Sequence, residues 1–169
     1  MSQAFDVATS SPPSSLTTTA PLLIKAGRDL SELYETGSRA LPHSLASSSA
    51  WLERCASLGD VESMVDYGLC CELGHGLEEP NLKEAFEWYK RAASSKLSDP
   101  QSVSSRGEAC YSVGDYYEFG KGGAKLNHTE AVMWYKRGMI DGDEDCEKGH
   151  TRLGQIAMII GNSVFEEGS

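Results

Sequence analysis

The sequence predicts an all-α solenoid, because one motif recurs three times and two helix patterns alternate along the chain. Each of the three tryptophans follows a glycine by 14 residues, and each of these glycines follows a glutamate by two. Each tryptophan also precedes an arginine by three residues. An internal repeat of this kind is typical of stacked solenoids. The matched residues are Glu35, Gly37, Trp51 and Arg54; Glu72, Gly74, Trp88 and Arg91; and Glu118, Gly120, Trp134 and Arg137.

The composition limits the class of partner. The chain has 169 residues, enough for one domain, and a formal net charge of −10. Nucleic acids and anionic membranes both need a basic surface, so we expect neither as a partner. No apolar run approaches 18 residues, so no membrane span is expected. A basic or mixed-charge protein partner is compatible with the charge; the alternative is that the acidity only maintains solubility.

The cysteines and the N-terminal sequence predict a cytoplasmic location, with the nucleus as the alternative. The chain has five cysteines and no CxxC spacing, as expected for reduced thiols that are mostly small core residues. The N-terminus lacks the basic and apolar regions of a secretory signal.

The first predicted segment, residues 1–20, is a flexible tail rich in Ser, Thr and Pro. From about residue 21, helices of a first kind, called A, end at the motif glycines, since glycine adopts the left-handed C′ conformation at little cost. Their apolar residues recur with helical spacing on one face. These residues are Leu30, Leu33 and Tyr34; Met64, Tyr67 and Cys71; and Cys110, Val113 and Tyr117.

Helices of a second kind, called B, carry the tryptophans. Asn81 and Asn127 are predicted N-caps, the latter in a pattern close to a capping box. The bodies are 85–93 and 131–139, with a weaker copy at 48–56. A second glycine family, Gly68, Gly114 and Gly154, lies inside the A helices. A mid-helix glycine costs about 1 kcal/mol against alanine, so its recurrence predicts close contact with a neighbouring helix.

The spacing between copies defines the predicted units. The tryptophans are 37 and then 46 residues apart, which predicts a Ser-rich loop inserted at 94–107. A smaller acidic insertion covers 141–147. We predict a solenoid over 21–161, comprising a degenerate repeat at 21–57, repeats at 58–93 and 108–139, a half repeat at 148–161, and a tail at 162–169.

The phrases Glu72-Leu73-Gly74-His75-Gly76 and Glu130-Ala131-Val132-Met133-Trp134-Tyr135-Lys136-Arg137 resemble the Sel1-like repeat, a relative of the tetratricopeptide repeat. The resemblance implies antiparallel helix pairs stacked into a right-handed superhelix with a concave groove. It also implies an adaptor or scaffold for protein complexes. The copies depart from the family pattern: Cys71 stands where the family prefers tyrosine, Trp51 is followed by Leu52, and the first copy lacks the second glycine of Gly-x-Gly.

No segment predicts catalysis, a cofactor or a metal. The run Gly120–Gly123 lacks phosphate-loop spacing, so a helix stop is the favoured interpretation. Cys146 and His150 are too few for a zinc site, which needs four ligands. The aromatic residues of the two good B helices are expected to be core. They are Trp88, Tyr89, Trp134 and Tyr135.

The predicted binding site is the groove lined by the A helices. In the register of Gly68 and Gly114, the outward positions combine carboxylates with apolar anchors and would suit an extended or helical peptide carrying Lys or Arg. The equally weighted alternative is a solvated acidic face. The predicted positions are Glu62, Val65, Leu69 and Glu72; Glu108, Tyr111, Asp115 and Glu118; and Thr151 and Gln155.

The apolar residues Leu153, Ile156, Ala157, Ile159 and Ile160 predict a last A-type helix without a B helix after it. It either docks a partner or a second copy of the chain, or folds against the preceding pair. The sequence thus predicts a non-catalytic interaction scaffold or adaptor, a subunit of a larger complex. The alternative is a regulator that binds and activates one specific enzyme.

Overall fold

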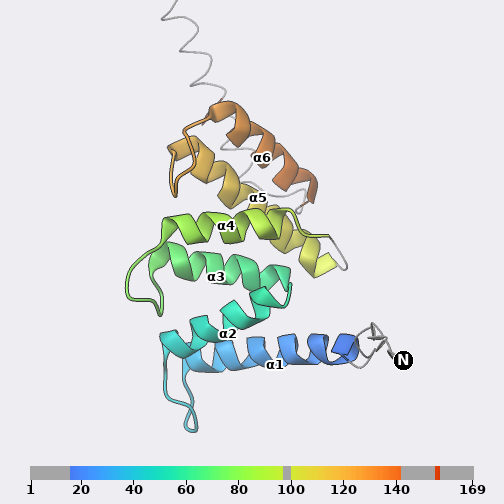
Figure 1. The fold of residues 1–169 in the computed structure, drawn as a ribbon, viewed down its shortest axis with the longest axis vertical. Coiled ribbons are helices and arrows are strands. Elements are labelled where there is room, and N and C mark those ends of the chain that lie inside the picture. The colour runs from blue at the N-terminus through green and yellow to red at the C-terminus, as the bar shows by residue number, and fades with distance from the viewer. Residues whose placement is uncertain (1–15, 97–99, 142–154, 157–169) are drawn as a thin grey trace, which may run out of the picture.

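The computed structural model describes residues 16–96, 100–141 and 155–156, and within them it contains α-helices and no strand. The helices follow one another in a single stack, from α1 at one end to α6 at the other (Figure 1). This confirms the predicted all-α solenoid of helix pairs. The helices are α1 (Leu16–Thr36), α2 (Leu45–Ser57), α3 (Val61–Leu73), α4 (Leu82–Ala93), α5 (Pro100–Phe119) and α6 (His128–Asp141).

Each A helix turns into its B helix through the same junction. The motif glycine has a positive φ of 73°, 73° and 62° in the three copies, which confirms its role as a helix stop. The N-cap residue of each B helix then donates its backbone N–H to the carbonyl oxygen three residues before the glycine. These bonds join Ser44 to Tyr34 (2.8 Å), Asn81 to Cys71 (2.7 Å) and Asn127 to Tyr117 (2.8 Å).

The predicted N-caps are also confirmed. Asn81 Oδ1 accepts a hydrogen bond from the Glu84 N–H at 3.1 Å, and Asn127 Oδ1 accepts one from the Glu130 N–H at 3.1 Å. Each bond satisfies an N–H of the first helical turn that has no partner within the helix.

The glycines inside the A helices receive a tyrosine ring from the paired B helix. A Cβ added at Gly68 would lie 2.8 Å from Tyr89 Cε1, and one at Gly114 would lie 2.5 Å from Tyr135 Cε1. Both distances are shorter than carbon atoms tolerate. The predicted close contact is thus confirmed for these two positions, while Gly154 lies outside the described residues.

The tryptophans lie beside this contact. Trp88 is buried, whereas Trp51 and Trp134 are only half-buried. In each copy the arginine three residues later places its guanidinium over the indole, at 4.8, 4.1 and 5.3 Å from the ring centroid. The recurring arginine therefore covers the exposed side of the tryptophan through a cation–π contact.

Two predicted boundaries differ from the structure. The first helix begins at Leu16 and not after residue 20, with Pro21 inside it. The predicted loop at 94–107 is wrong in its second part, because α5 begins at Pro100. Proline suits the first position of a helix, where its missing N–H has no partner to lose.

The added turns of α5 also have packing partners, which explains why this Ser-rich stretch is helical. Arg106 Nη1 donates to the Ser95 carbonyl oxygen at 3.4 Å. The Gly107 carbonyl oxygen lies so close to α6 that a Cβ at Gly138 would meet it at 2.9 Å.

The C-terminal part is described only at Asp141 and at residues 155–156. Ile156 is fully buried and packs with Ala131 and Tyr135 of α6. At this residue the chain folds against the preceding pair, as the second interpretation of the apolar helix predicted. The acidic insertion beyond Asp141 and the remainder of the predicted half repeat lie outside the described residues.

Cysteines act as small core residues in this fold. Cys55, Cys71 and Cys110 are buried, and the four described cysteines form no disulfide. Burial raises the pKa of the Cys71 thiol to about 12. For Cys70, burial and then the charge of Asp66 raise the pKa to about 11. These thiols stay protonated at neutral pH, the unreactive form.

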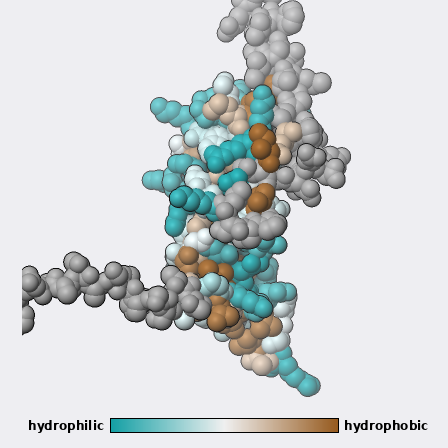
Figure 2. Space-filling view, turned by 90° about the vertical axis from the view of Figure 1, so that its right-hand side faces the viewer, coloured by the Kyte–Doolittle hydropathy of each residue, from teal (hydrophilic) through white to brown (hydrophobic). Residues whose placement is uncertain are grey.

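Apolar side chains are also exposed on the surface. Figure 2 shows them in brown, scattered between hydrophilic side chains on the face that it presents. In α1 the most exposed are Leu22 and Leu23, at 69% and 52% of their full area.

The glycine–tyrosine contact can be tested by a double-mutant cycle. Gly68→Ala should lower the free energy of unfolding by about 1–3 kcal/mol, because the added methyl overlaps the Tyr89 ring. The gain of about 1 kcal/mol in helix propensity does not offset this strain. In Tyr89→Leu the same alanine should be tolerated, since Ser31 and Leu52 occupy the corresponding positions of the first copy. Urea denaturation of the unmodified chain, the two single variants and the double variant measures the coupling between the two positions. Strictly additive losses in the free energy of unfolding would contradict the contact.

Candidate functional site

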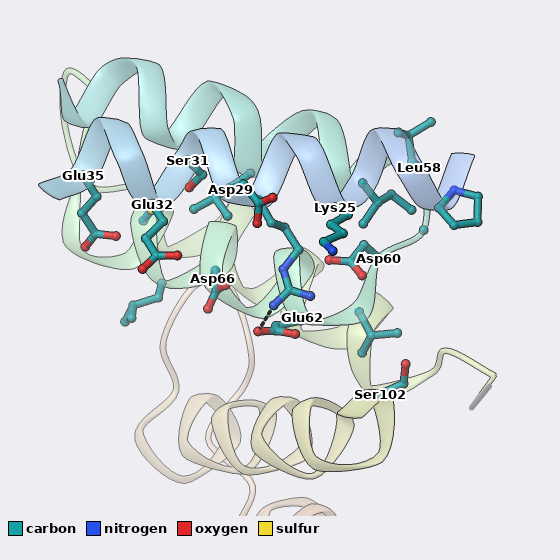
Figure 3. Close-up of a pocket in the computed structure, with 18 of the residues that line it drawn as sticks. Lys25, Asp29, Ser31, Glu32, Glu35, Leu58, Asp60, Glu62, Asp66 and Ser102 are labelled. Carbon is teal, nitrogen blue, oxygen red and sulfur yellow. Dashed lines mark ion pairs between the residues drawn. The ribbon is translucent and has the colours of Figure 1, made fainter. Parts of the chain in front are cut away.

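A groove of about 940 Å³ lies along the A-helix side of the stack. One face of α1 and one face of α3 form its walls, and Ser102 near the start of α5 contributes from the far side (Figure 3). The loop between α2 and α3, with Leu58 and Asp60, closes one end.

Carboxylates dominate the lining of the groove. Asp29, Glu32 and Glu35 project from successive turns of α1, and Glu62 and Asp66 face them from α3 (Figure 3). Fewer basic side chains line the groove, and these are Lys25, Arg28 and Lys96.

Few of these charges neutralise each other. Arg28 forms an ion pair with Glu62 across the groove. Asp60 caps α3, since its Oδ2 accepts the Ser63 N–H at 3.0 Å. Among the described residues, Asp29, Glu32, Glu35 and Asp66 form no ion pair. The groove therefore presents an excess of negative charge.

The pKa of Asp66 is raised in this groove, mainly by desolvation. Its side chain is exposed, but the groove walls remove part of its hydration, which raises its pKa to about 6. The charges of Glu62 and Glu108 contribute to this increase in pKa, and Arg28 opposes them. An added cation beside Asp66 would relieve this repulsion.

The predicted site residues divide into three groups. Glu62 and Leu69 line the groove, as the sequence predicted for outward positions. Val65 is wrong as an outward position because it is only 6% exposed, and Asp66 takes its place on the groove face. Residues four apart share a helix face as readily as residues three apart, and α3 uses the spacing 62, 66, 69.

The second group serves the fold. The Tyr89 hydroxyl donates to Glu72 at 3.1 Å, and the Tyr135 hydroxyl donates to Asp115 at 2.5 Å and Glu118 at 2.6 Å. Glu118 is 6% exposed, so its prediction as an outward partner-binding position is wrong. The recurring glutamate before each glycine therefore holds a B-helix tyrosine in these two copies. Burial and then these carboxylates raise the pKa of Tyr135.

The third group is scattered. Glu108 is exposed on α5, and its charge acts on Asp66. Tyr111 is half-buried and packs on the Tyr135 ring at 5.1 Å between centroids. Gln155 is exposed, and Thr151 lies outside the described residues.

The sequence analysis missed the contribution of α1. Carrying the glycine register back by 37 residues places Lys25, Asp29 and Glu32 at the positions of Glu62, Asp66 and Leu69. All three line the groove. The signal is therefore present in the sequence of the first copy, although that copy departs from the repeat pattern at other positions.

The comparisons identify the repeat. The family model "Sel1 repeat" matches residues 61–97 and 107–138. These residues form Sel1 repeats. Among the solved structures, the chain is similar to a Sel1 repeat protein from Oxalobacter formigenes, with 24% identity and a TM-score of 0.64. That match covers 83% of this chain and 52% of the other, so the chain spans about half the length of that protein.

Another similar structure is cysteine rich protein B of Helicobacter pylori. It has 17% identity and a TM-score of 0.51 and covers 80% of this chain and 94% of the other. At these identities both likenesses concern the fold alone. None of the curated proteins matches this chain.

Two searches of the described residues bear on other kinds of site. They contain no group of three or more His, Cys, Asp or Glu side chains placed to hold a metal ion. No helix among them is long and apolar enough to cross a membrane.

The tyrosine–carboxylate bonds predict unequal losses of stability. Tyr135→Phe should lower the free energy of unfolding by about 1.5–3 kcal/mol, because two carboxylates lose a donor and one of them is buried. Tyr89→Phe removes one longer bond to a half-buried glutamate and should lower it less. Urea denaturation measures both, and equal losses would contradict the assigned geometry.

The raised pKa of Asp66 predicts that the free energy of unfolding depends on pH. Because its pKa in the folded chain exceeds the usual value of about 3.9, the folded state binds this proton more tightly than the unfolded state. The contribution of Asp66 to stability is therefore lost as pH rises from about 4 through 6. Asp66→Asn should raise the melting temperature at pH 7.5, and the difference should vanish below about pH 4. Glu79→Gln, in an exposed loop, is the control, and a difference independent of pH would exclude the assigned cause.

Proposed function

We propose that this Sel1-repeat chain is a non-catalytic scaffold that binds an extended segment of a partner protein along the groove between α1 and α3. Sel1 repeats are in general protein–protein interaction modules. The observation that carries the proposal is the set of four groove carboxylates without an ion-pair partner among the described residues. Basic side chains of a partner protein would form ion pairs with these carboxylates.

The dimensions of the groove suit a short segment. Lys25 and Glu35 are ten residues apart on α1, or about 15 Å at a helical rise of about 1.5 Å. An extended chain advances about 3.3 Å per residue, so four or five residues span this length.

The apolar lining would supply the anchor. Leu69 lies on the groove face of α3 and is 48% exposed, with Asp66 one turn before it. A segment with lysine or arginine beside an apolar residue could bury the apolar side chain against Leu69 and pair its charge with Asp66. Such a segment gains both apolar burial and charge complementarity.

The wider role follows from this binding mode. A groove that accepts one segment suits a subunit of a larger cytoplasmic complex. It equally suits a regulator that binds and activates one enzyme. The composition of the complex recovered with the chain would distinguish them, as several stoichiometric partners or as one enzyme.

Charge reversal of the α1 wall tests the groove. A labelled peptide Lys-Ala-Leu-Lys-Ala-Leu-Lys should bind the chain, and Glu32→Lys/Glu35→Lys should weaken binding by roughly tenfold or more, since each exposed charge pair contributes about 0.2–1 kcal/mol and reversal adds repulsion. Fluorescence anisotropy measures the affinity.

The matched control is Glu78→Lys/Glu79→Lys, which makes the same change in net charge at two exposed positions that do not line the groove. It should weaken binding much less. If both pairs weaken binding equally, the peptide responds to the overall charge, and the groove is not its site.

A further inference from the structure

The charges of the groove are sorted along its length. Figure 3 shows Lys25 near Leu58 and Asp60 at one end of α1, and Glu32 and Glu35 toward the other end. Arg28 lies between them and is paired with Glu62. The charged side chains that α1 contributes therefore change from basic to acidic along the groove, and Asp60 of the α2–α3 loop lies beside Lys25.

The acidic end draws its charge from two helices. Asp29, Glu32 and Glu35 belong to α1, and Asp66 faces them from α3 (Figure 3). His75, just past the end of α3, also lines this part of the chain's groove.

The opposite end combines two lysines and the N-cap Asp60 with apolar side chains. Lys25 lies in the same turn as Ile24 and near Pro21 and Leu58. Lys96 follows Ser95, whose carbonyl oxygen accepts the Arg106 hydrogen bond, so Lys96 lies near the first turns of α5. Both lysines are exposed, and neither forms an ion pair among the described residues.

The helix dipoles favour the same arrangement of partner charges as the side chains do. Helices α1 and α3 are the A helices of successive pairs and run in parallel, so their N-terminal halves lie together. Residues near helix N-termini line the lysine end, namely Pro21, Asp60, Val61 and Ser102. Residues near the C-termini of α1 and α3 line the acidic end, namely Glu35 and Cys70. Helix N-termini favour anions and C-termini favour cations.

We propose that the groove binds a partner segment whose own charges are sorted, with an acidic side chain at the Lys25 end and basic side chains four or five residues away at the Glu32 end. This inference rests on the proposed function and adds a requirement for the acidic residue. A purely basic segment would place cations beside Lys25 and Lys96. A segment with mixed charges would meet like charges at both ends.

The partner is another protein. Residues 1–15, which precede α1, contain no lysine or arginine and cannot supply the basic part of such a segment.

Three labelled peptides with blocked termini test the sorting. The sorted peptide is Asp-Asp-Ala-Leu-Ala-Leu-Lys-Lys, the mixed peptide has the same composition in the order Asp-Lys-Ala-Leu-Ala-Leu-Lys-Asp, and the third is the basic peptide above. The sorted peptide should bind roughly tenfold more tightly than the mixed one, on the scale of two to three exposed charge pairs.

Replacing the two groove lysines by glutamate should change the affinities for the sorted and the basic peptide in opposite directions. Lys25→Glu/Lys96→Glu should weaken binding of the sorted peptide and strengthen binding of the basic peptide. The control Lys83→Glu/Lys136→Glu makes the same change in net charge at exposed positions outside the groove and should change the ratio of the two affinities little.

The outcomes separate the two proposals. If the sorted and mixed peptides bind equally and the basic peptide also binds, the sorting is overturned and the proposed function stands. If none of the three binds, both are overturned. A peptide of residues 143–152, which is acidic and then basic, completes the set. If it binds as tightly as the sorted peptide, the occupant is a second copy of the chain, and the assignment to another protein is overturned.

Discussion

The contact of one tyrosine with one glycine and one glutamate holds each complete helix pair. Tyr89 and Tyr135 place their rings on Gly68 and Gly114, where any side chain would collide with them. Their hydroxyls reach the carboxylates that precede the helix-stopping glycines, at 3.1 Å for Glu72 and 2.6 Å for Glu118. The ring fixes how closely the helices approach, and the bond fixes their register. The recurring glycine and glutamate thus belong to one structural unit.

The first copy lacks this unit, and its absence shapes the groove. Leu52 stands where the other copies have tyrosine, and it has no hydroxyl to donate. Ser31 stands in place of the glycine and bonds instead to Ser48, with 3.0 Å between the hydroxyl oxygens. Glu35, the counterpart of Glu72 and Glu118, is therefore released from the helix contact and lines the groove. The substitution of Leu52 for tyrosine in the first copy thus leaves a charge on the groove face.

The sequence predicts features that depend on local contacts better than features that depend on contacts between helices. The junctions were predictable because glycine, the N-cap residue and the A-helix face act within a few residues of each other. The groove was less predictable because its face depends on how helices pack. Val65 and Asp66 are neighbours in sequence, and only the rotation of α3 against α2 and α4 decides which of them is buried. The helical start of α5 depends on contacts of Arg106 with Ser95, just after α4, and of Gly107 with α6, which no local pattern reveals.

The separation of fold and groove has a consequence for stability. The glycine–tyrosine–glutamate units stabilise the helix pairs without using Asp29, Glu32 or Asp66. The pKa of Asp66 is raised, first by desolvation and then by the charges of Glu62 and Glu108. A sequence selected only for stability would not gather these carboxylates on one face, since repulsion between like charges destabilises the folded chain. Local departures from stabilising patterns are expected where a surface serves binding. The carboxylates between α1 and α3 therefore lie outside the units that hold the helix pairs, and the binding role proposed above accounts for them.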